Sequence, residues 1–171
     1  MGEFFPGAIQ IGGAVPRRLA PDLAQAITEV GALAEAEAAP AIFATAEDLH
    51  AAVDPVSGVI RLYDHDASYG AFSSLEDWLR EHGIAYDRQS DARYEYDGEA
   101  VFFRSGPGLR TFHATQDGAP TVCLDRLTPV RTLLRDALAE RSPEKVRAAL
   151  AELDEALGPD VPPLAPFTFT D

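Results

Sequence analysis

A chain of 171 residues with 28 acidic and 14 basic side chains carries a formal net charge of −14. This charge repels phosphate backbones, so direct nucleic-acid binding is disfavoured and a basic protein is the expected partner. No apolar run approaches the roughly 18 to 20 residues that a membrane span needs, so we expect a soluble protein without a membrane contact.

Cysteine usage and chain length limit the class further. Cys123 is the only cysteine, which excludes an intramolecular disulfide and a cysteine-based zinc cage and fits a reducing compartment. Residues 1–6 lack the basic start and apolar core of a secretion signal. We therefore expect a cytoplasmic protein, folded as a single domain over residues 1–171 because the length suits one well-packed core.

The N-terminal part predicts a strand at residues 8–11, a turn at Gly12-Gly13, and a helix from about Pro16 to beyond Gly31. The glycine turn before a helix could cradle an anion, but it lacks the lysine of a phosphate loop and the third glycine of a dinucleotide fingerprint, so a structural turn is favoured. The helix should face a sheet through apolar residues at helical spacing, namely Leu19, Leu23, Ile27 and Val30.

Residues 45–66 predict a short helix, a strand and an acidic loop, in that order. Thr45 and Asp48 resemble a capping box that opens a short helix over residues 46–53, and a strand is predicted at residues 59–63. The loop after that strand contains Asp64, His65 and Asp66, whose carboxylates could bind a divalent cation or act as acid and base. Two oxygen ligands alone do not make a metal site, so a solvated polar strand end is the alternative.

The middle of the chain predicts a helix and a hairpin. Ser74 as N-cap and Gly83 as stop bound a helix over residues 74–82. Asp97-Gly98 has the residues of a type I′ turn, which would place Tyr96 opposite Glu99, Tyr94 opposite Val101 and Asp91 opposite Arg104. The two tyrosines could form a recognition surface or simply stabilise the sheet.

The C-terminal part predicts two helices and an extended tail. Cys123 falls in an apolar strand, where a buried packing role is favoured over a nucleophile. Thr128-Pro129 opens a helix through about residue 140, and Ser142-Pro143 opens another through residue 157, so the two should pair as a hairpin. The Pro-rich tail, residues 158–171, contains apolar residues that could dock on the body or on a partner: Leu164, Phe167 and Phe169.

These elements together predict an α+β fold: a mixed, largely antiparallel sheet with helices packed on one face and a C-terminal helical hairpin. The helices expected to cover the sheet start near Pro16, Ser74 and Pro129.

The strongest functional signal is the segregation of charge, because residues 19–60 hold seven acids and no base. Such a patch can steer a basic partner, so we expect a non-enzymatic protein-binding module without a cofactor or metal. The expected binding residues are Glu35, Glu37, Glu47, Asp48, Asp54, Tyr94 and Tyr96. The alternatives are a structural accessory protein and a small enzyme whose site is assembled around Asp64, His65 and Asp66, with Arg88 and His113 as further candidates. Common catalytic motifs are absent from the sequence.

Five short stretches also resemble small uncharacterised acidic proteins of bacteria and their mobile elements. They are Phe5-Pro6-Gly7-Ala8-Ile9-Gln10-Ile11-Gly12-Gly13, Tyr69-Gly70-Ala71-Phe72, Tyr94-Glu95-Tyr96-Asp97, Gln116-Asp117-Gly118 and Pro162-Pro163-Leu164-Ala165-Pro166-Phe167. The resemblance brings no activity, cofactor or site residue with it. It implies a setting in which an inhibitor or modulator of host machinery would occupy a basic, nucleic-acid-binding surface of its target.

Overall fold

The computed structural model describes residues 3–34, 42–92, 97–115, 118–158 and 160–171. The chain forms two compact units, which we call unit 1 (Met1–Pro120 and Val161–Asp171) and unit 2 (Thr121–Asp160). The predicted α+β fold is confirmed: unit 1 is built on an antiparallel sheet with helices, and unit 2 is a helical hairpin.

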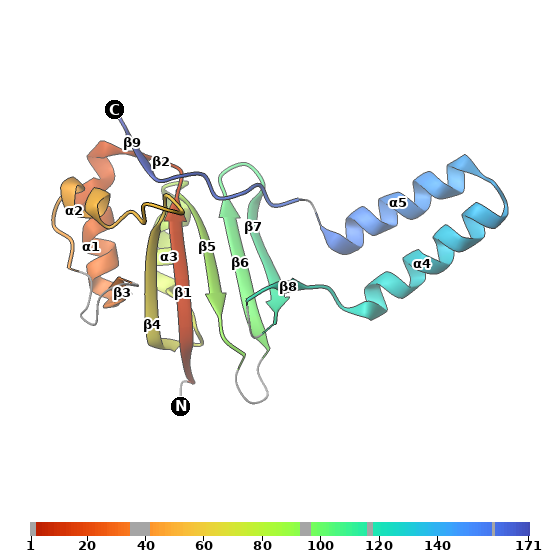
Figure 1. Ribbon diagram of the computed structural model, residues 1–171, viewed down its shortest axis with the longest axis horizontal. Helices are drawn as coiled ribbons and strands as arrows, with labels where there is room; N and C mark the ends of the chain where they lie inside the picture. The colour runs from red at the N-terminus through yellow and green to blue at the C-terminus, as the bar shows by residue number, and fades with distance from the viewer. Residues whose placement is uncertain (1–2, 35–41, 93–96, 116–117, 159) are drawn as a thin grey trace. The chain divides into compact units, whose positions relative to one another are not determined.

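The sheet has seven strands in the order β3-β4-β1-β5-β6-β7-β8, and β1 lies between β4 and β5 (Figure 1). A separate parallel pair joins β2 to β9. The strands are β1 (Phe4–Gly12), β2 (Ala14–Pro16), β3 (Leu33–Ala34), β4 (Ile60–Ser68), β5 (Ala85–Ser90), β6 (Gly98–Arg104), β7 (Gly108–Ala114), β8 (Pro120–Thr121) and β9 (Thr168–Thr170).

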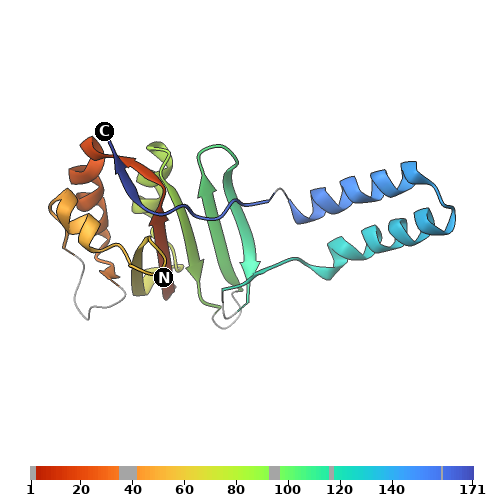
Figure 2. The same cartoon turned by 45° about the horizontal axis from the view of Figure 1, so that its top comes forward.

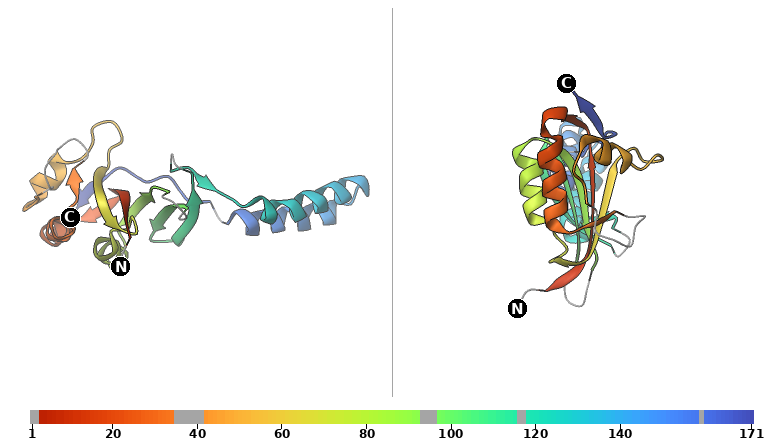
Figure 3. Two further views of the ribbon diagram at one scale, coloured as in Figure 1. Left: turned by 90° about the horizontal axis from the view of Figure 1, so that it is seen from below. Right: turned by 90° about the vertical axis from the view of Figure 1, so that its left-hand side faces the viewer.

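Helices α1 (Ala20–Val30) and α3 (Ser73–Glu81) lie on the same side of the sheet (Figure 3). Alternating residues of β1, such as Ile9 and Ile11, are fully buried together with one face of each helix. The helix-facing core also contains Leu23, Ile27, Leu49, Ile60, Leu62, Leu75, Leu79, Tyr86 and Val101. The short helix α2 (Ala46–Ala51) has the predicted capping box at Thr45 and Asp48.

The first helix is shorter than predicted. A 3-10 turn, Arg17–Leu19, precedes α1, and Gly31 ends the helix with a left-handed φ of 67°. A glycine adopts that conformation without the steric cost that a Cβ imposes, so Gly31 ends the helix. The predicted continuation of the helix beyond Gly31 is therefore wrong.

The C-terminal tail docks on unit 1. Residues 161–167, which we call the strap, run across the strands before β9 pairs with β2 (Figure 2). The Phe167 N–H donates to the Gly58 carbonyl at 2.7 Å, and the Gly13 N–H donates to the Ala165 carbonyl at 2.8 Å. Phe167 is only 4% exposed. Of the two alternatives for the tail, the structure thus shows docking on the body, and the Gly12-Gly13 turn has a structural role because the strap occupies it.

The predicted two-residue turn at Asp97-Gly98 is wrong. Strand β5 pairs with β6 so that Ser90 lies opposite Glu99 and Arg88 opposite Val101, which places the connection over the whole of residues 91–97. Gly98 is a strand residue opposite Ala114. Pairing of two long half-buried strands outweighed the local turn preference. Residues Tyr94 and Tyr96 lie outside the described part of the chain.

The Asp91–Arg104 pairing is wrong for the same reason. The Arg104 guanidinium donates instead to the Asp87 carboxylate at 2.6 Å and to the Pro162 carbonyl of the strap at 3.0 Å. Arg104 is 8% exposed, so this arginine joins β5, β6 and the strap below the surface.

Unit 2 consists of α4 (Leu124–Ala139) and α5 (Pro143–Leu157), which pack as the predicted hairpin. Helix α4 starts one turn earlier than predicted, with Pro129 inside its first turns, and its partner in packing is α5. Cys123 is therefore the residue before a helix, and it is exposed, so its predicted burial in a strand is wrong. Ser142 caps α5 by accepting from the Lys145 N–H, as its position before Pro143 suggests.

We predict that Phe167→Ala destabilises the protein by about 3–5 kcal/mol, because it removes a buried ring that holds the strap on unit 1. Urea unfolding measured by circular dichroism gives the value. Val56→Ala, at a side chain 94% exposed, is the control and should change the stability by less than about 0.5 kcal/mol. Equal effects of the two changes would contradict the docked strap.

We also predict that Gly98→Val destabilises by about 1–3 kcal/mol through overpacking. A Cβ at Gly98 would lie 3.0 Å from the Ser90 carbonyl oxygen and 3.1 Å from that of Ala114. Gly106→Val is the matched control, since no heavy atom lies within 4 Å of a Cβ there. The same urea experiment should separate the two variants, and a stable Gly98→Val protein would show that the observed register is wrong.

Candidate functional site

The residues proposed for an assembled catalytic site do not come together. Asp64, His65 and Asp66 belong to β4 and not to a loop, and the Asp64 carboxylate accepts from the Asp66 N–H at 2.9 Å. His65 packs edge-on against Tyr63, with ring centroids 4.5 Å apart. No group of three or more His, Cys, Asp or Glu side chains among the described residues is arranged to hold a metal ion.

The other two candidates lie on different strands from this cluster. Arg88 is 5% exposed on β5 and forms an ion pair with Glu76. His113 is exposed on β7, with its Nδ1 3.6 Å from the Asp97 carboxylate. The two strands are separated by β6, whose Glu99 pairs with Arg88 and lies opposite His113.

Antiparallel pairing instead gathers acids from distant parts of the sequence at one end of the sheet. Gly7 of β1 lies opposite both Asp64 of β4 and Ser90 of β5, and the N–H of Asp91 donates to the Pro6 carbonyl at 3.1 Å. The end is the one at which the chain begins, at the bottom of Figure 1. We call it the acidic sheet end, and define it by five residues: Glu3, Asp64, Asp66, Asp91 and Asp97.

The charges of this end act on one another. Strands lie about 4.8 Å apart, so Asp64 and Asp91 on either side of β1 are separated by about 10 Å, close to the screening length in physiological salt. Burial and the negative charges of Asp91 and Asp64 raise the pKa of Tyr63. The described arginines on the outer parts of the strands lie toward the other end of the sheet: Arg61 is opposite Gln10, Arg104 opposite Gly108 and Arg110 opposite Phe102.

Sequence reasoning missed this surface because it searched for runs of acids. The five residues come from four separate segments that only strand pairing brings together. The usable signal was the alternation of strand directions. In an antiparallel sheet, one end of the sheet contains the end of β4, the start of β1, the end of β5 and the start of β6.

The acids predicted from the run in residues 19–60 have mixed roles. Asp48 accepts from the N–H groups of Ala44 and Thr45, and Asp54 from those of Val56 and Ser57. These hydrogen bonds hold the pKa of both carboxyl groups below the usual value. Both side chains thus stabilise local turns, whereas Glu47 is exposed beside them. Glu35 and Glu37 lie outside the described residues.

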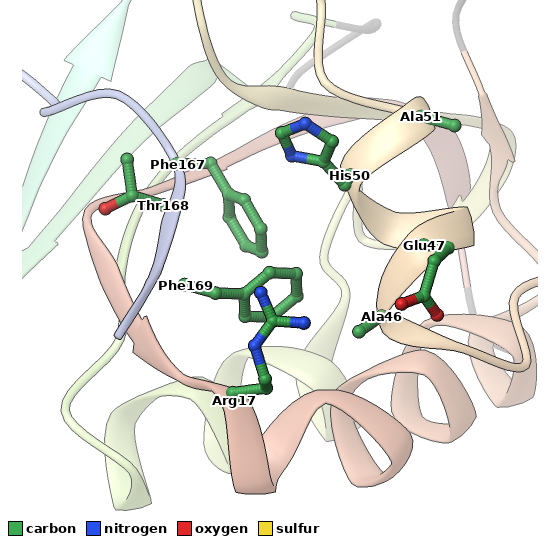
Figure 4. Close-up of a pocket in the computed structure, with 8 residues that line it drawn as sticks. All are labelled: Arg17, Ala46, Glu47, His50, Ala51, Phe167, Thr168 and Phe169. Carbon is green, nitrogen blue, oxygen red and sulfur yellow. The ribbon is translucent and has the colours of Figure 1, made fainter. Parts of the chain in front are cut away.

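Glu47 borders an open pocket of about 400 Å³ between α2 and β9 (Figure 4). Phe167 and Phe169 form its aromatic wall, and Arg17 lies over the Phe169 ring at 5.3 Å from the ring centre. The remaining lining residues are Ala46, His50, Ala51 and Thr168. An apolar wall with a few polar groups at the rim suits an apolar side chain or ring that carries a polar group. The tail, which docks on the body, therefore also contributes to a pocket.

A second feature is a buried ion network under α3. The Glu76 carboxylate accepts from the Phe72 N–H at 2.9 Å and from the Tyr86 hydroxyl at 3.2 Å, and it lies 3.2 Å from the Arg88 Nε. Arg88 also pairs with Glu99 of β6. Burial and the Glu76 charge raise the pKa of Tyr86 above its ordinary value. Each charge has a partner, so the network has the properties of a structural clamp.

Comparison of the chain with protein-family models, with curated proteins and with solved structures gave no match. Within the described residues, every helix is too short or too polar to cross a membrane.

We predict that Glu76→Gln destabilises unit 1 by about 1–3 kcal/mol, because it removes the buried partner of Arg88 and leaves the half-exposed Glu99 as its counter-charge. Asp77→Asn is the control in the same helix: Asp77 pairs with Arg80 at the surface, with a side chain 69% exposed, and its loss should cost less than about 1 kcal/mol. Thermal and urea unfolding of both variants test this, and similar losses would mean that the network does not stabilise the fold.

Proposed function

We propose that unit 1 is a non-enzymatic protein-binding module whose acidic sheet end contacts a basic surface of a partner protein. The observation that carries this proposal is the gathering of Glu3, Asp64, Asp66, Asp91 and Asp97 at one end of the sheet, while the described strand arginines lie elsewhere. Such an arrangement gives a directional field, which evenly spread acids do not give.

The charge of unit 1 supports the same proposal. Unit 1 holds 20 of the 28 acids and 8 of the 14 bases, a net charge of −12, whereas unit 2 holds 8 acids and 6 bases, a net charge of −2. Two of the eight arginines, Arg88 and Arg104, are buried and paired internally. Among the described residues of unit 1, ten acids but only three arginines are exposed. The surface is therefore acidic enough to attract a basic partner and to repel nucleic acid.

The pocket between α2 and β9 is a separate surface from the acidic sheet end. Strand β9 pairs with β2, which follows the far end of β1, whereas the acids gather beside the first residues of β1. In its sharpest form, which the resemblance to mobile-element proteins favours, the module is an inhibitor that occupies the nucleic-acid-binding groove of a host protein.

The test compares two triple variants with equal charge. Asp66→Lys, Asp91→Lys and Asp97→Lys reverse the acidic sheet end, and Asp22→Lys, Glu29→Lys and Glu81→Lys reverse three exposed helical acids. A fluorescent arginine-rich peptide of about 12 residues is titrated at low and at physiological salt. We expect the first variant to bind about tenfold more weakly than the second at low salt, with a smaller difference in added salt.

Circular dichroism should show both variants folded, because all six side chains are exposed. Equal weakening in the two variants would mean that only the net charge matters, and binding that ignores salt would rule out the acidic sheet end as the contact.

A further inference from the structure

The hairpin of unit 2 exposes leucines that its own packing does not use. Along the α4–α5 seam the buried side chains are Val130, Ala137 and Ala149, which are small or medium in size. Five leucines of the hairpin are exposed. One, Leu133 (47%), lies on the other side of the seam, and the remaining four are Leu124 (76%), Leu138 (67%), Leu150 (46%) and Leu157 (42%). Large apolar side chains grouped on one surface mark an interaction site.

Helical geometry places these four leucines on one face of the hairpin. Leu138 follows the seam residue Ala137 by one position, and Leu150 follows Ala149 in the same way, so each is turned by about 100° from the seam. Because α4 and α5 run antiparallel, the same turn leads to the same face in both helices. Leu124 lies two heptads before Leu138 in α4, and Leu157 lies one heptad after Leu150 in α5. Both therefore lie on that face as well. We call it the leucine face.

The charges at its border are mainly positive. The same rotation places Arg131 and Arg135 of α4 and Arg147 of α5 beside the leucines, with Asp154 as the acid. The opposite face carries Asp136, Glu140, Glu152 and Glu155 with Arg126 and Lys145, and the Lys145–Glu140 ion pair lies there. The hairpin is thus apolar and basic on one face and mostly acidic on the other.

We propose that the leucine face docks an acidic amphipathic helix of another protein, with the apolar stripe of that helix on the leucines and its acids beside the three arginines. A helix laid along two antiparallel helices completes a three-helix core and covers apolar side chains that α4 and α5 leave exposed. Charge complementarity selects this occupant.

Other occupants fit the charges less well. A second copy of the hairpin would bring its own arginine-bordered face against this one, so that like charges oppose each other. An anionic membrane would attract the arginines, but it would repel the net charge of −12 in unit 1 of the same chain. The inference is independent of the function proposed for unit 1. Together they describe an adaptor with an acid-binding and a base-binding surface.

Two synthetic helical peptides of about 18 residues test the proposal with the full-length protein. Both carry leucines at helical spacing, and their flanking positions are Glu in one and Lys in the other. Fluorescence anisotropy should show binding of the Glu peptide and at least tenfold weaker binding of the Lys peptide. Leu138→Ser with Leu150→Ser, and separately Arg131→Glu with Arg135→Glu, should each weaken the Glu peptide at least tenfold.

The opposite face supplies matched controls. Leu133→Ser changes a leucine of α4 that is 47% exposed but lies on the other side of the seam, and Arg126→Glu is the corresponding charge change. Neither should alter binding by more than about twofold, within ordinary surface effects. The proposal is overturned if wild type fails to bind the Glu peptide, or if the controls weaken binding as much as the face variants. Dimerisation in sedimentation, or stronger binding to anionic phospholipid vesicles than to the peptide, would also overturn it.

Discussion

The buried carboxylate of Glu76 fixes how the helical layer meets the sheet. It closes the start of α3 by accepting from the Phe72 N–H, and it reaches Tyr86 and Arg88 on β5. Arg88 then extends the contact to Glu99 on β6. A buried charge is costly unless its partners are in place, so this network penalises any shift of α3 along the strands and any slip of β6 against β5. The position of α3 thus depends on the same register that decides which side chains lie at each sheet end.

That register also sorts the charges of unit 1. In an antiparallel sheet, the end of one strand lies beside the start of the next, so acids that precede or follow strands gather at one end. Asp66 near the end of β4 and Asp91 after β5 are 25 positions apart in the sequence, yet both lie beside the first residues of β1. Arg104 lies at the other end, where it neutralises Asp87 and holds the strap. Among the described residues, acids thus gather at one end of the sheet, while Arg104 has a structural role at the other.

Sequence patterns identified most elements whose signals are local and missed those that pairing decides. The predicted N-cap Ser74 is wrong, because α3 begins at Ser73 and Phe72 is the residue before it. The α2 capping box, the Gly83 stop and the Ser142-Pro143 start depend on residues within a few positions, and all three are present. Asp97-Gly98 is an equally strong local signal, but the strands of residues 85–90 and 98–104 pair in a register that leaves Gly98 inside β6. Cys123 was placed in a strand because its neighbours are apolar, and nothing local shows that a helix begins at Leu124. The acidic sheet end was missed for the same reason as the hairpin register.

Unit 2 is inserted in the sequence between Pro120 and Val161, two points that both belong to unit 1. Unit 1 needs the strap for its core, since Phe167 is buried and residues on both sides of it form hydrogen bonds with the Gly13 turn. The chain therefore leaves unit 1 after Pro120 and returns to it at Val161, and the hairpin of unit 2 forms the connection. If the segment served only to connect these two points, a short polar loop would be enough, because exposed leucines add no stability and promote association. The four leucines of the leucine face with their arginine border are thus best explained by a contact that the hairpin makes with another molecule.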